Sequence, residues 1–357
     1  MRSLFLVLFV GLTLLPKGDV YGQTPRQDPD PGVLSVELRS GVPFASSYFT
    51  AEWKRAERGQ AVDGAWWGLG SGLAVSYGLS ERFGIVVDWL SGWTFASGYT
   101  EDENARRQGP ANLRIAVPIL LVSEMRASGG GLEPAPRRPP GRGGALIGLG
   151  PVTLKAAPVG VIDIPGYDMD VQAERFRNGS SYVAEPPDVA AHALGMQLSQ
   201  RMSPVEQVRV EAGQEFLYYF PADYEAQSLD NYQTNVVRSS LADADAYETI
   251  YYRFGLRWTI GGWYFVPTAA GHELSPGLFL EGRHRPRPVV DDILVEDTDS
   301  HLVSITPRIR WTPPLWGGRT TFSLGAGVPL FGKNSDAAHE LSFAVTTRFL
   351  GPYAAGL

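Results

Sequence analysis

Three segments near the C-terminus alternate apolar and polar side chains, and this pattern constrains the fold more than any other feature of the chain. Residues 302–311, 321–330 and 341–349 each carry apolar side chains at alternate positions. A period of two indicates β-strands, because successive side chains of a strand point to opposite faces. In a soluble sheet the apolar face turns toward a core, whereas in a transmembrane β-barrel it faces lipid and the polar face lines the lumen.

Weaker forms of the same alternation recur earlier and bring the expected number of strands to about twelve, all within residues 33–349. The earlier expected strands are 33–39, 66–77, 83–89, 113–121, 145–159, 194–198, 208–220, 252–260 and 277–283. Long polar joins alternate with short ones, which is the asymmetry between extracellular loops and periplasmic turns. The pattern favours an all-β fold: an antiparallel, up-and-down transmembrane β-barrel with both termini in the periplasm.

Three prolines interrupt this scheme. Pro118, Pro307 and Pro329 fall inside expected strands and have no N–H group to donate to a ladder. We therefore expect a bulge or a strand end at each of them. The residues Met202-Ser203-Pro204 also predict a turn between two strands.

The N-terminus predicts export. Arg2 precedes an apolar run at residues 4–15, and small Gly22 stands before Gln23. A run of this length is too short to span a bilayer, so residues 1–22 are expected to be a signal peptide and residues 23–357 the barrel. An N-terminal anchor helix is the alternative interpretation.

The amino-acid composition limits the kinds of site and of binding partner that this protein can have. The chain has 0 cysteines, which excludes disulfides, thiolate metal sites and a cysteine nucleophile. The formal net charge of −7 argues against nucleic acid as a partner. The longest apolar run after the signal, residues 115–122, is too short for a membrane helix. We expect a protein of the bacterial cell outer membrane whose partners are outer-membrane lipid and a small-molecule solute, with no cofactor.

The polar faces carry charges of both signs, which in a closed barrel share one lumen and set its selectivity. The residues expected to line the pore are Glu37, Arg39, Asp88, Arg114, Arg209, Glu211, Glu215, Arg253, Arg257, Glu281, Arg283, Arg308, Arg310 and Arg348.

The C-terminal strands have a strong excess of arginine on this face, with Glu281 as the one carboxylate counted there. One wall should therefore be electropositive, and a pore for anionic or carboxylated small molecules is one interpretation. The other is an Arg–Glu lattice that fills and stiffens the barrel. A barrel of about twelve strands lies between small barrels filled by side chains and wide porins, so both interpretations stay open.

Enzyme motifs are missing from the sequence. The 5 histidines are scattered without the spacing of a metal motif, and no G-x-S-x-G nucleophile elbow occurs. We therefore expect no catalytic, cofactor-binding or metal-binding residues, and no enzymatic activity. A barrel lipase or deacylase built around His192 is the enzyme alternative.

Four short motifs carry a resemblance to a known family. They are residues 77–83 (YGLSERF), 178–180 (NGS), 306–311 (TPRIRW) and 325–330 (GAGVPL). In this order they resemble the outer-membrane β-barrel proteins grouped with the meta-pathway of phenol degradation. The resemblance implies a channel for aromatic or other small hydrophobic compounds. Family members end on an aromatic residue, whereas here residues 350–357 follow Phe349.

Together these observations predict an outer-membrane channel for passive uptake of small molecules, aromatic or anionic ones included. One alternative is a structural or surface-interaction barrel whose lumen is plugged by charge pairs or by residues 127–144. The other is a secreted soluble β-sandwich.

Overall fold

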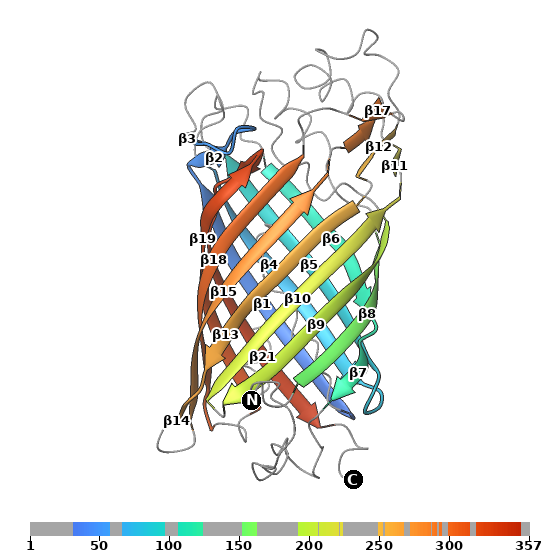
Figure 1. The fold of residues 1–357 in the computed structure, drawn as a ribbon, viewed down its shortest axis with the longest axis vertical. Coiled ribbons are helices and arrows are strands. Elements are labelled where there is room, and N and C mark those ends of the chain that lie inside the picture. The colour runs from blue at the N-terminus through green and yellow to red at the C-terminus, as the bar shows by residue number, and fades with distance from the viewer. Residues whose placement is uncertain are drawn as a thin grey trace, which may run out of the picture.

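In the computed structural model, the described part of the chain forms a closed antiparallel barrel of 12 long strands (Figure 1). The described residues are 31–57, 66–96, 106–123, 152–162, 192–205, 207–220, 222–223, 249–252, 254–267, 272–286, 288–290, 293–294, 299–314 and 319–350. The expected signal peptide (residues 1–22), the expected plug (residues 127–144) and the motif at 178–180 lie outside them. The described residues contain no helix long and apolar enough to cross a membrane.

The barrel strands follow one another around the ring in chain order. They are β1 (Val33–Ala45), β4 (Trp66–Gly78), β5 (Gly84–Ala96), β6 (Arg106–Ala116), β8 (Val152–Ile162), β9 (Ala193–Val205), β10 (Val208–Tyr219), β13 (Phe254–Tyr264), β15 (Glu273–Arg285), β18 (Ser300–Thr312), β19 (Thr320–Lys333) and β21 (His339–Leu350). Two short strands, β7 (Ile119–Ser123) and β14 (Val266–Pro267), pair with β8 and β15. The ring closes where β1 pairs with β21, from Val33 opposite Leu350 to Phe44 opposite His339.

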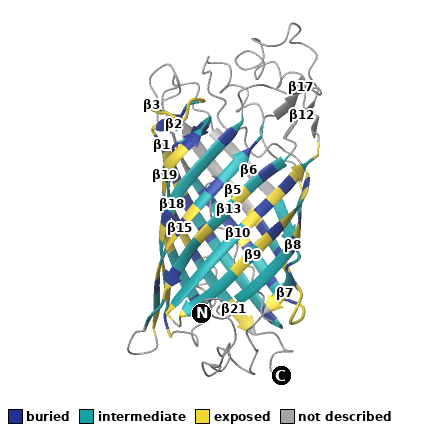
Figure 2. Ribbon diagram, in the orientation of Figure 1, coloured by how far each residue is buried: buried dark blue, intermediate teal, exposed yellow. Residues whose placement is uncertain are grey.

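The outer surface of the barrel is apolar, which confirms the membrane-barrel interpretation of the alternation. Leu278 and Leu280 are 53% and 38% exposed, whereas Phe279 between them is 3% exposed. Figure 2 shows the same banding of exposed and covered positions along the strands. A sandwich needs a second sheet to cover an apolar face, and here one sheet closes on itself instead. The soluble β-sandwich alternative is therefore wrong.

Two small sheets extend one end of the barrel (Figure 1). One consists of β2 (Ser47–Phe49), β3 (Arg55–Glu57) and β20 (Ser335–Asp336), and the other of β11 (Ala222–Asp223), β12 (Thr249–Tyr252), β16 (Pro288–Val290) and β17 (Ile293–Leu294). Strand β1 begins and β21 ends at the opposite end, where a short turn at residues 79–83 joins β4 to β5. Short turns mark the periplasmic end of outer-membrane barrels.

Two of the three strand prolines behave as expected. Pro118 lies in the break between β6 and β7. Near Pro329 the β18–β19 register shifts between Val303 and Ser304, which is the expected irregularity. The missing N–H group explains both positions.

The expectation at Pro307 was wrong. It lies inside β18 opposite Leu278, and Ile305 and Arg308 on either side keep a single register with β19. Each residue of an antiparallel strand directs its N–H group toward one neighbour only, so a proline removes one ladder bond without ending the strand. The turn expected at residues 202–204 was also wrong, because β9 continues to Val205.

Candidate functional site on the inner wall of the barrel

Ion pairs between strands that are not neighbours identify the inner face of the barrel. Arg39 on β1 donates to Asp88 on β5 over 2.7 Å, past the intervening strand β4. Arg114 on β6 pairs with Glu215 on β10, past β8 and β9. Side chains of separated strands meet only on the concave side of a closed sheet, so these four residues point inward.

Side chains alternate between the two faces along a strand. These four inward residues, together with the cross-strand registers, therefore show which other residues face inward. The sequence-predicted residues on the inner face are Glu37, Arg39, Asp88, Arg114, Arg209, Glu211, Glu215, Arg257, Glu281, Arg283, Arg308, Arg310 and Arg348. Arg253 lies outside the described residues. Whether a solute passes along these side chains stays a prediction.

The most buried group of charges surrounds Arg39, whose side chain is 1% exposed. Its Nε atom lies 2.8 Å from Glu37 Oε1, and its Nη2 atom donates to Asp88. Thr346 on β21 donates its hydroxyl hydrogen to Glu37 Oε2 over 2.8 Å. Ala74 on β4 lies opposite Glu37 and Asp88 on its two neighbours, and this small side chain leaves Arg39 room to reach Asp88. The group links β21, β1 and β5 along the wall.

A second group forms around Arg114. Its guanidinium donates to Glu215 and, over 3.0 Å, to Gln197 Oε1 on β9. Gln197 is 5% exposed and was not among the predicted site residues. The alternation of the expected strand at 194–198 nevertheless places it on the polar face. A third group forms around Glu281, which accepts hydrogen bonds from Arg308 and, over 2.9 Å, from Thr306.

Sequence reasoning missed Trp263, a large aromatic residue on the inner face. Its indole N–H donates to Glu211 Oε2 over 3.1 Å, and Arg201, also missed, lies 3.4 Å from the other oxygen of Glu211. Arg310 lies over the Trp263 ring, with its guanidinium carbon 3.5 Å from the ring centre. The expected strand ended at Ile260, and extending its alternation to residue 263 is the signal that would have found this residue.

Basic residues are distributed along the wall from end to end. Arg348 lies opposite Ser35 near the start of β1, and Arg283 lies opposite Leu302 toward the other end.

The count of one carboxylate for the C-terminal strands was wrong, because Glu340 at the start of β21 lies opposite Pro43 on the inward face. It was missed because the expected strand began one residue later.

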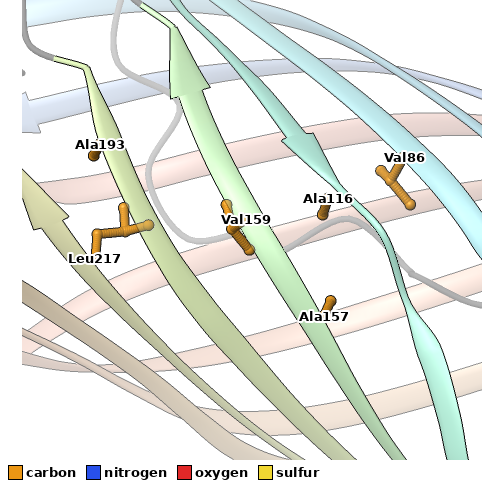
Figure 3. Packing of buried hydrophobic residues seen from close by; sticks show 6 residues of the cluster. All are labelled: Val86, Ala116, Ala157, Val159, Ala193 and Leu217. Atoms are coloured by element: carbon orange, nitrogen blue, oxygen red, sulfur yellow. The ribbon is translucent and has the colours of Figure 1, made fainter.

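The inner wall also has an apolar part, shown in Figure 3. Its buried residues come from five consecutive strands, β5, β6, β8, β9 and β10. They are Val86, Ala116, Ala157, Val159, Ala193 and Leu217. Parity with inward Asp88, Arg114, Gln197 and Glu215 places them on the same face as the charges. The inner surface therefore has an apolar patch between these charged groups, which sequence reasoning did not single out.

The fold brings two distant histidines together on the outer face. The rings of His284 and His301 stack with centroids 4.1 Å apart, and His301 Nε2 lies 3.3 Å from Asp299, just before β18. Lys333 Nζ donates to Asp299 over 2.6 Å. Burial alone would raise the pKa of Asp299, but Lys333 and His301 outweigh it and hold that pKa below its usual range. Within the described ranges, no group of three or more potential ligands is placed to hold a metal ion.

Comparison with known proteins identifies the fold. No family model and no curated protein sequence matches the chain. A solved outer membrane channel from Pseudomonas putida F1 superposes with a TM-score of 0.60 at 11% identity, covering 92% of this chain and 99% of that one. The protein has the fold of an outer-membrane channel. Its closed barrel and apolar outer surface place it in the outer membrane.

Two further structures match less well. The KdgM porin gives a TM-score of 0.37 at 9% identity, over 88% of this chain and 99% of that one. The translocator domain of the autotransporter NalP from Neisseria meningitidis gives a TM-score of 0.40 at 9% identity, over 98% of this chain and 95% of that one. TM-scores this low do not indicate a shared fold in detail.

Proposed function

We propose that the protein is a passive outer-membrane channel for small molecules and that the sequence-predicted charged residues line its pathway. The observation that carries this proposal is how the inner charges are bonded. The ion pairs described above join strands no more than three positions apart in the ring, so they lie along the wall rather than across the diameter. Arg257 is exposed although it points inward, which supports water-accessible space beside it.

The balance of charge supports a preference for anions. Inner-wall carboxylates at positions 37, 88, 211, 215 and 281 each have a cationic partner, and Glu340 is a sixth carboxylate on this face. Arginines 209, 257, 283, 310 and 348 add further positive charge to the same face. In a narrow aqueous space such a wall attracts anions and repels cations. The resemblance to barrels grouped with the meta-pathway of phenol degradation supports aromatic compounds as part of the solute class.

Conductance in planar bilayers tests this function. Heat-modifiable migration on a gel first shows that the inserted protein is folded. We expect discrete current steps in KCl and, under a KCl gradient, a reversal potential on the anion-selective side of zero. Folded protein that gives no current above background would remove the channel function. We also propose that residues 1–22 are the export signal, which mass determination of the mature chain tests.

A barrel with a plugged lumen is the second candidate, and the apolar inner surface favours it. Val86 and Ala116 face inward and yet are both 0% exposed, which fits a lumen filled with side chains at that level. Such a barrel would have a structural or surface-interaction role. Absence of conductance from folded protein is the result that this candidate predicts.

A further inference from the structure

Arg310 on the inner wall is held by an aromatic ring instead of by a carboxylate. Its guanidinium lies over the Trp263 ring, and its Nη1 atom is buried without a hydrogen-bond partner among the described residues. Arg308, two positions away on the same face, lies over the Phe279 ring but is also bonded to Glu281. A guanidinium has five N–H donors and no acceptor. Arg310 as a whole is only half-buried, so an incoming acceptor can reach its guanidinium and satisfy donors that are now unpaired.

The ring beneath Arg310 is fixed by the backbone of the next strand. Trp263 lies opposite Gly277, where a Cβ atom would come within 2.6 Å of Trp263 Cε3. Phe279 is placed in the same way opposite Gly261, where a Cβ atom would lie 2.4 Å from Phe279 Cδ1. The two ring centroids are 5.0 Å apart. Each ring thus occupies the space over a glycine.

A hydrogen bond fixes the edge of the same ring. Trp263 is 2% exposed, and its N–H group is bonded to Glu211. The indole therefore has backbone beneath it, a carboxylate at its edge and the guanidinium above it. A group held in place before binding loses less conformational entropy when a ligand arrives.

We propose that Arg310 binds the carboxylate of a small organic monoanion and that Trp263 is the positioning residue that holds its guanidinium. This inference rests on the proposed channel function and names its substrate class. The planar fork of a guanidinium matches the two oxygens of a carboxylate. Ser323 on β19, directly opposite Arg310, adds a hydroxyl group on the same face. One charge without an anionic partner fits a monoanion better than a dianion.

Ligand binding to the folded full-length protein in detergent tests this inference without requiring an open pore. Saturation-transfer NMR titrations use benzoate as the probe and benzyl alcohol as its neutral analogue. We expect saturable benzoate binding, with Kd raised about tenfold or more in Arg310→Gln, since a charge-assisted hydrogen bond is lost. Arg82→Gln, which removes an exposed arginine at the turn between β4 and β5, is the control and should leave Kd within about twofold, a range well below the effect of such a bond.

Variants of Trp263 test its positioning role separately. Trp263→Leu should weaken benzoate binding while leaving the benzyl alcohol signal unchanged, and Trp263→Phe should restore most of the benzoate affinity because a ring again supports the guanidinium. Equal benzoate affinity in the wild type and in Arg310→Gln overturns the proposal, as does a wild type that binds no benzoate. A conducting channel with either result keeps the proposed function and loses only this site.

Discussion

Gly277 on β15 lies directly opposite Trp263 on β13, and a Cβ atom on this glycine would lie 2.6 Å from the indole ring. Gly277→Ala should therefore displace the ring and lower the free energy of unfolding by about 1–3 kcal/mol, as overpacking does. Urea denaturation in detergent micelles measures the change. Gly327→Ala is the matched control, because its Cβ atom would meet Glu340 Cβ at an ordinary 3.5 Å. Similar losses from both variants would contradict the packing argument.

Reversing the charge of two inward arginines should change ion selectivity. In Arg257→Glu combined with Arg310→Glu, the pathway loses positive and gains negative charge, so the reversal potential in a KCl gradient should move toward that of a cation-selective pore. Arg82→Glu, at the exposed turn between β4 and β5, changes the charge of the protein outside the wall and should have little effect because salt screens it. An unchanged potential in the double variant would mean that these side chains do not line the pathway.

Removing Arg39 should be strongly destabilising. Its substitution by Met leaves Glu37 and Asp88 without their cation, and breaking a buried pair in this way costs about 3–5 kcal/mol. Adding Asp88→Asn should recover part of the loss, because one uncompensated carboxylate is then gone. Lys54→Met breaks a pair whose side chains are 74% and 71% exposed, and it should cost less than about 1 kcal/mol. Denaturation midpoints of the four proteins test the order.

Adjacent residues on β13 should respond in opposite ways to a positive charge. Ile260 faces outward and is 48% exposed, whereas Thr259 has the inward parity of Trp263. Ile260→Lys should lower the free energy of unfolding in lipid vesicles by about 2–4 kcal/mol if it lies near the bilayer midplane, because the charge meets lipid. Thr259→Lys should be tolerated better than Ile260→Lys. Equal losses would contradict the assignment of the two faces.

Asp299 should make part of the stability depend on pH. Its pKa is lower in the folded protein than in the unfolded chain, so its contribution is present above the unfolded pKa and is lost as the pH falls through the folded one. Asp299→Asn should therefore flatten the loss of stability below about pH 4. Lys333→Gln should raise the pKa of Asp299, which a carboxyl NMR titration measures. An unchanged pKa in that variant would contradict the role of Lys333.

Local sequence predicts the faces of this fold much better than its contacts. Alternation alone placed Arg39, Asp88 and Glu215 on the polar face, because parity depends only on neighbours in the chain. Which strand lies beside which, and in what register, depends on distant residues. The pairing of Arg114 with Glu215 and the fit of Trp263 over Gly277 follow from register, so neither was predicted.

Strand ends were the other source of error. The expected strands at 252–260 and 341–349 stopped short of Trp263 and Glu340, since the alternation weakens where the strand meets a turn. Pro307 was given too much weight, because the β18–β19 pairing skips Thr306 and Pro307 but resumes at Arg308 in the same register. The expected strand at 33–39 was too short for the same reason as the first two, and β1 continues to Ala45.

The seam between β1 and β21 also determines when the barrel can be completed. The hydrogen bond from Thr346 to Glu37 joins residues 309 positions apart, so this contact has the high sequence separation that slows folding. Until β21 arrives, β1 presents an unpaired edge that other strands can extend. The first strand of the barrel in chain order is thus among the last to be fully paired, and during that interval its open edge is a site for aggregation.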